Sequence, residues 1–116
     1  MIREFYQYGL LIHEDGSVEV VRQKDGVTQI RWIREVLNGM RYGNFAEVNA
    51  PGGVMLFCPG AADERPINQA AGEILRGKET VCGRALYLPG KVQDGYRLYT
   101  HDRADREKKI LEVLIR

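Results

Sequence analysis

The chain has 116 residues with 13 glycines, 4 prolines and 2 cysteines, and its formal net charge is +1. This length and composition predict one globular domain over residues 1–116, and they exclude a multidomain enzyme, a collagen-like repeat and a disulfide-rich miniprotein. The near-neutral total gives no strong nucleic-acid signal, because proteins that bind nucleic acid non-specifically carry a basic excess.

The first residues and the two cysteines indicate a cytoplasmic protein. The start, Met1-Ile2-Arg3-Glu4, is charged, and no apolar run follows it that would form the core of a signal peptide. No stretch approaches the roughly 18 apolar residues of a membrane span, so we expect no membrane association. Cys58 and Cys82 lie in apolar segments, and two cysteines do not form a disulfide framework. We expect both to be reduced core residues, with a disulfide between them as the alternative.

The chain begins with a predicted hairpin. Residues 5–13 are rich in aromatic and branched side chains, and residues 17–21 resume the strand pattern after Glu14-Asp15-Gly16. An Asp-Gly pair between two such runs favours a tight turn.

From Thr28 the apolar residues recur at helical spacing. The predicted buried stripe consists of Ile30, Ile33 and Leu37, widened by Trp32 and Val36. Thr28 is the expected N-cap and Asn38-Gly39 the expected stop. Arg31, Arg34 and Glu35 then point towards water.

Residues 45–48 and 54–58 predict a second hairpin around a turn at residues 49–53. The second of these strands is continuously apolar, which is typical of a central strand covered on both faces. Residues 59–66 predict a loop.

A short helix follows at residues 69–76, with Asn68 as N-cap and Gly77 as the residue after its end. Its expected apolar face is Ala70, Ala71, Ile74 and Leu75. Gly72 inside this helix indicates either close packing or a frayed helix, because glycine costs about 1 kcal/mol relative to alanine there.

The remaining predicted elements are strands at residues 80–88 and 96–99 and a helix at residues 104–115. This last helix has Ile110, Val113 and Leu114 on one side, and Thr100 or Asp102 can cap it. The order is therefore ββαββαββα, which predicts an α+β fold with a mainly antiparallel sheet and three helices.

Residues that supply enzyme chemistry are scarce. Ser17 is the only serine and follows a turn glycine, and only His13 and His101 can act as imidazole bases. Neither histidine lies in a sequence with the paired ligand spacing of a zinc site, and no glycine-rich phosphate loop is present. We therefore expect no catalytic residues, no metal and no cofactor.

The cations favour anion binding, since twelve are arginines and only five are lysines. A guanidinium offers a planar fork of donors that suits carboxylates and phosphates. In the segment from Gly39 to Asn44, a tyrosine can stack on a base while an arginine contacts a phosphate. The helix that starts at Asn68 offers free N–H groups to an anion, with an arginine close by. The candidate ligand-binding residues are Arg41, Tyr42, Arg65, Asn68 and Arg84. For each of these features a simpler interpretation stays open. The arginines are then solvated, residues 39–44 form an ordinary helix-to-strand connection, and Asn68 only caps its helix.

Three parts of the chain, in order, resemble a known family. They are Glu14-Asp15-Gly16-Ser17-Val18-Glu19-Val20, then Gly53-Val54-Met55-Leu56-Phe57-Cys58, then Pro66-Ile67-Asn68-Gln69-Ala70-Ala71 with Val81-Cys82-Gly83-Arg84-Ala85-Leu86. They resemble the uncharacterised family called domain of unknown function 3846, found in bacteria, phages and plasmids, over residues 8–88. The resemblance implies a small accessory protein of mobile elements and carries over no catalytic residues.

These features favour a non-enzymatic binding protein of phage or mobile-element type, which sequesters a small anionic, nucleotide-like ligand to counter host defence. A second hypothesis is a protein-interaction module that inhibits or adapts a host protein through a sheet edge or a helix face. A third is a small hydrolase that uses carboxylates. We also expect a homo-oligomer, because small α+β domains often complete a core or pocket by self-association.

Overall fold

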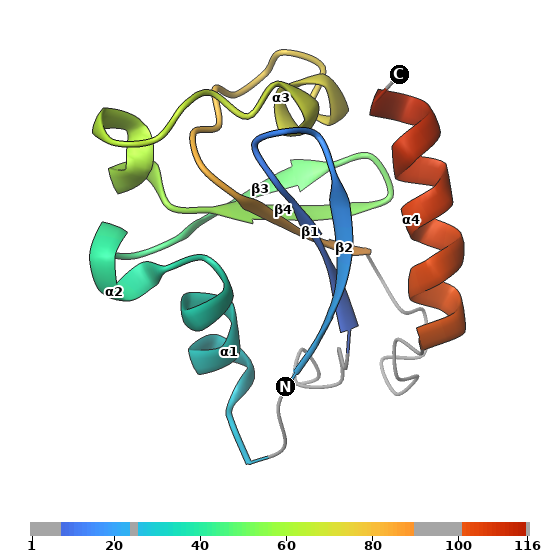
Figure 1. Cartoon of the computed structure of the whole chain (residues 1–116), viewed down its shortest axis with the longest axis horizontal. Coiled ribbons are helices and arrows are strands. Elements are labelled where there is room, and N and C mark those ends of the chain that lie inside the picture. The colour runs from blue at the N-terminus through green and yellow to red at the C-terminus, as the bar shows by residue number, and fades with distance from the viewer. Residues whose placement is uncertain (1–7, 24–25, 90–100, 116) are drawn as a thin grey trace.

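A five-stranded antiparallel sheet, in the order β2-β1-β5-β4-β3, forms the middle of the molecule (Figure 1). The computed structural model describes residues 8–23, 26–89 and 101–115. The strands are β1 (Tyr8–Ile12), β2 (Val18–Arg22), β3 (Ala46–Ala50), β4 (Gly53–Phe57) and β5 (Ala85–Pro89). The helices are α1 (Gln29–Val36), α2 (Gly39–Tyr42), the 3-10 helix η2 (Pro59–Asp63), α3 (Gln69–Ile74) and α4 (His101–Ile115). The predicted α+β class and antiparallel sheet are confirmed. The predicted order with three helices is wrong, because the described residues contain two further short helical segments, α2 and η2.

Helices cover both faces of the sheet, and this gives the molecule two hydrophobic cores (Figure 1). Alternate residues of a strand point to opposite faces. Met55 and Phe57 of β4 therefore pack towards α3 and α4, whereas Leu56 and Cys58 pack towards α1. The prediction that this strand is covered on both faces is confirmed, although β5 is the strand at the centre of the sheet.

The first hairpin turns where the sequence predicts it. The backbone N–H of His13 donates to the carbonyl of Ser17, and that of Gly16 donates to the carbonyl of His13, both at 2.9 Å. Gly16 has a φ of +89°, a left-handed conformation that favours glycine. The Asp15 carboxylate accepts hydrogen bonds from the backbone N–H and the hydroxyl of Ser17, and these bonds lower the pKa of Asp15.

Helix α1 begins as predicted, because the Thr28 hydroxyl accepts a hydrogen bond from the N–H of Arg31 at 3.3 Å. Trp32, Ile33 and Leu37 are buried, but Ile30 is 55% exposed, so its place in the predicted stripe is wrong. Gln29 is buried instead. The spacing of apolar residues indicates a helix but does not fix how the helix is rotated against the sheet.

Helix α4 shows the same kind of difference. Leu111 is buried against the sheet, whereas Ile110 and Val113 are exposed, so the predicted apolar side is wrong at those two positions. The face that contacts the sheet also contains half-buried Lys108 and Glu112, whose long side chains can cover apolar surface with their stems. The buried side of the helix is therefore rotated relative to the prediction. The helix also begins at His101 rather than at residue 104, so Asp102 lies inside it and is not its cap. No helix in the described part of the chain is long and apolar enough to cross a membrane.

The region between β4 and β5 differs most from the prediction. The predicted loop contains η2, and the predicted strand at residues 80–88 begins only at Ala85. Before Ala85 one bridge joins Ile67 to Cys82, and Gly83 then takes a φ of +78°, which interrupts a regular ladder. A Cβ on Gly72 would meet nothing within 4 Å, so close packing does not explain that glycine. The predicted strand at residues 96–99 and the predicted cap at Thr100 lie outside the described residues.

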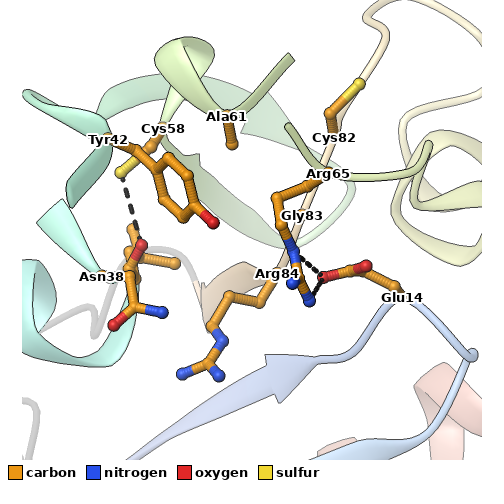
Figure 2. A pocket seen from close by; sticks show the side chains of 10 residues that line it. Glu14, Asn38, Tyr42, Cys58, Ala61, Arg65, Cys82, Gly83 and Arg84 are labelled. Atoms are coloured by element: carbon orange, nitrogen blue, oxygen red, sulfur yellow. Dashed lines mark hydrogen bonds and ion pairs between the residues drawn. The ribbon is translucent and has the colours of Figure 1, made fainter. Parts of the chain in front are cut away.

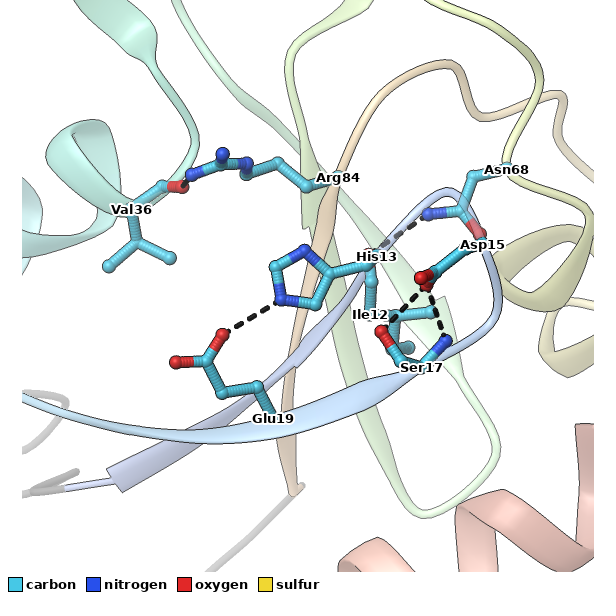
Figure 3. A network of polar contacts seen from close by, with 8 residues as sticks. All are labelled: Ile12, His13, Asp15, Ser17, Glu19, Val36, Asn68 and Arg84. Atoms are coloured by element: carbon cyan, nitrogen blue, oxygen red, sulfur yellow. Dashed lines mark hydrogen bonds and ion pairs between the residues drawn. The ribbon is translucent and has the colours of Figure 1, made fainter.

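Asn68 is fully buried and holds three segments together, one of which is the end of β1 at Ile12 (Figure 3). Its side-chain oxygen accepts a hydrogen bond from the N–H of Ala71 at 3.0 Å, which caps α3 as predicted. Its side-chain nitrogen donates to the carbonyls of Ile12 at 3.0 Å and Gly83 at 2.9 Å. The end of β1, the segment before β5 and the start of α3 therefore share one amide group.

We expect N68D to lower the free energy of unfolding by about 3 kcal/mol, because it keeps the cap oxygen but removes both donors and leaves two buried carbonyls unpaired. Urea denaturation at neutral pH measures this change. The exposed N-cap variant T28A is the control and should lose about 1 kcal/mol or less. A loss in N68D no larger than that in T28A would contradict the role given to the amide.

Candidate functional site

A cavity of about 70 Å³ lies at the end of the sheet where β1 and β4 finish and the chain approaches β5 (Figure 2). Its polar lining consists of Glu14, Asn38, Tyr42, Arg65 and Arg84. Leu37, Cys58 and Ala61 supply apolar wall. The lining residues come from six separate parts of the chain, which only the fold brings together.

Tyr42 reaches the cavity from α2, a four-residue helix where the sequence predicts a loop. Asn38 has a φ of +59° and ends α1, and its carbonyl then accepts hydrogen bonds from the N–H groups of Arg41 and Tyr42 at 3.0 and 3.1 Å. Helix η2 lies directly against this turn, since a Cβ on Gly60 would be 2.2 Å from the carbonyl oxygen of Tyr42. Only glycine at residue 60 allows this approach.

The Cys58 thiol forms part of the wall and is held in place. It donates towards the carbonyls of Leu37 at 3.6 Å and Gly43 at 3.7 Å, and burial raises the pKa of Cys58. A thiol with a raised pKa is a poor nucleophile at neutral pH. Cys58 and Cys82 are both free, so the alternative of a disulfide between them is wrong, and Cys82 is only partly buried.

Arg65 and Glu14 form an ion pair across the cavity (Figure 2). The Nε–H of Arg65 donates to Oε1 of Glu14 at 2.8 Å, and an Nη2–H donates to the same oxygen. This hydrogen bonding raises the pKa of Arg65.

Arg84 is half-buried and has a different environment. Its Nη1–H donates to the carbonyl of Val36 at the end of α1, at 3.0 Å (Figure 3). Within the described residues, no carboxylate pairs with this guanidinium. The cavity is therefore lined by two guanidinium groups and one carboxylate.

The remaining candidates from the sequence do not line the cavity. The Arg41 guanidinium lies 5.7 Å from the centre of the Tyr42 ring and pairs with Glu64 at 2.9 Å, and this contact with Glu64 raises the pKa of Arg41. Asn68 uses its amide entirely in the contacts that hold β1, α3 and the Gly83 segment together. The structure thus brings together Tyr42, Arg65 and Arg84, places Arg41 beside them, and gives Asn68 a supporting position.

Glu14 is the one charged residue of the cavity lining that the sequence did not place among the candidate ligand-binding residues. It lies in the turn beside Asp15, and both acids have the appearance of ordinary turn residues. The three neighbours His13, Glu14 and Asp15 take different partners, namely Glu19, Arg65 and Ser17. In the part of the chain that the structure describes, no three such ligands gather around a metal position.

The volume and charge of the cavity limit what it can hold. A space of about 70 Å³ is larger than one water molecule needs but far smaller than the several hundred cubic ångströms of a typical cofactor site. Its size and its arginines suit one small anionic group.

Comparisons with protein-family models, curated proteins and solved structures give no significant match for this chain. The resemblance to domain of unknown function 3846 stays a prediction.

We expect G60A to lower the free energy of unfolding by about 1–3 kcal/mol, because the added methyl group overlaps the carbonyl of Tyr42. The matched control is G72A, which adds the same group to a helix where nothing lies within 4 Å. It should raise stability by up to about 1 kcal/mol. Thermal and urea unfolding of the two variants measure both effects, and equal stabilities would show that the approach of η2 to α2 is not as tight as described.

Proposed function

We propose that this chain is a non-enzymatic binding protein whose cavity takes the anionic group of a small ligand. The observation that carries this proposal is the environment of Arg84. Its guanidinium is half-buried and has no carboxylate partner among the described residues. A bound anion would supply the acceptors that this half-buried cation lacks.

A phosphate or a carboxylate is the group that fits. A guanidinium can donate two parallel hydrogen bonds to either of them, and Arg84 uses only Nη1 in its contact with the protein. The cavity is too small for a whole nucleotide, so the rest of such a ligand would extend from Tyr42 in the cavity wall towards Arg41 outside it. An aromatic ring with a neighbouring guanidinium suits a nucleobase.

The chemistry of the wall supports binding rather than turnover. Cys58 lies in the cavity wall, where its single S–H has the carbonyls of Leu37 and Gly43 as acceptors and where burial raises the pKa of Cys58. It is therefore a poor nucleophile. Sequestration of a nucleotide-like signal by a phage or mobile element, to counter host defence, is the specific form of this proposal, and it rests on the predicted family resemblance.

We expect R84Q to weaken the binding of inorganic phosphate by about 10- to 100-fold, because a charge-assisted hydrogen bond contributes about 1.5–3 kcal/mol. Isothermal titration calorimetry with phosphate, and then with nucleoside monophosphates, measures the change. R106Q is the matched control, since it removes the same charge from an exposed position on α4.

The R106Q variant should bind phosphate as the unaltered chain does. Equal affinities of R84Q and R106Q would refute the assignment of Arg84 to an anion site. Denaturing the purified protein and identifying the released small molecules would then show which phosphate compound, if any, the chain carries.

A further inference from the structure

Glu14 already places an anion on one of the two cavity arginines (Figure 2). Its side chain is only 16% exposed, whereas that of Arg65 is 45% exposed. A single carboxylate oxygen accepts both the Nε–H and an Nη2–H of Arg65. The position that a ligand anion would take on Arg65 is therefore filled by a residue of the same chain.

The turn that carries Glu14 does not depend on this ion pair. It is held by the backbone hydrogen bonds between His13 and Ser17 and by the two bonds from Ser17 to Asp15. The Glu14 carboxylate has no other hydrogen-bond partner among the described residues. Rotation of one side chain can therefore uncover Arg65 without unfolding the hairpin.

An anion that enters the cavity meets Glu14 as a competitor. Two like charges a few ångströms apart repel each other. The N–H donors of Arg65 also cannot form their full set of hydrogen bonds with both anions at once. Because Glu14 is tethered, it competes as though it were present at millimolar concentration or above. A carboxylate ligand carries the same charge and the same acceptors as Glu14, so it gains little by replacing it.

We propose that Glu14 is an internal competitor that makes this cavity selective for phosphate over carboxylate, an inference that rests on the proposed function. A phosphate monoester carries nearly two negative charges and three acceptor oxygens near neutral pH. It can contact Arg84 and take the place of Glu14 on Arg65 with more charge than Glu14 supplies. The ligand class is therefore a phosphate monoester or inorganic phosphate.

The test compares phosphate and acetate as probes by isothermal titration calorimetry at one pH and ionic strength. The variants are E14Q, which keeps the size of the side chain but removes its charge, and E14A, which removes most of the side chain. The matched control is E64Q, because Glu64 forms a similar ion pair with Arg41 but does not line the cavity. Thermal unfolding confirms that each variant is folded.

We expect E14Q and E14A to bind phosphate about fivefold more tightly than the unaltered chain. Their affinity for acetate should rise by a larger factor than that for phosphate, so that the preference for phosphate shrinks. Equal gains for the two anions would contradict the proposed role of Glu14 in selectivity. E64Q should leave both affinities unchanged. Binding of phosphate by E14Q but not by the unaltered chain would also support the competitor role.

Three other outcomes overturn the inference and can be told apart. If the unaltered chain binds phosphate and E14Q binds it equally or more weakly, Glu14 is not a competitor, while the proposed anion site stands. If neither protein binds phosphate, both the inference and the proposed function fail. An equal gain in E64Q would show that only the net charge of the chain matters.

Discussion

The buried side-chain amide of Asn68 is the constraint on which the cavity depends. Its two donors are bonded to the carbonyls of Ile12 and Gly83, and its oxygen caps α3. In each of these segments a charged residue of the cavity lies within three positions of Asn68 or of the residue that its side chain contacts. Glu14 lies two residues after Ile12, Arg84 directly follows Gly83, and Arg65 comes three residues before Asn68 itself. A buried amide must find partners for all of its polar atoms, so these segments cannot shift independently.

The antiparallel sheet explains why residues so distant in the sequence meet at this place. β5 lies between β1 and β4 and runs opposite to both. The ends of β1 and β4 are therefore beside the start of β5, which puts the turn at Glu14, the thiol of Cys58 and the guanidinium of Arg84 at one end of the sheet. The contact of Gly60 with the backbone of Tyr42 then closes the remaining side with an aromatic ring.

The elements that the sequence predicts well are those whose cause is local. An Asp-Gly turn, the N-caps at Thr28 and Asn68 and the apolar face of α3 depend on residues within a few positions of one another. Two predictions that are wrong concern how a helix is rotated against the sheet. Ile30 on α1 and Ile110 on α4 belong to helical patterns, yet both are exposed, because the rotation of a helix is decided by the sheet beneath it.

For the site, the sequence by itself determined the residue types: arginines, a tyrosine and a capping asparagine in segments that end strands or begin helices. Only the tertiary structure decided which of them share a cavity. It joined Tyr42, Arg65 and Arg84, moved Arg41 to a pair with Glu64, and committed Asn68 to internal hydrogen bonds. It also selected Glu14 rather than its neighbour Asp15 as the partner of Arg65, 51 residues away. Spacing along the chain predicts neighbours on one element, whereas a contact of that separation depends on how the sheet, the turn and the Asn68 amide fit together.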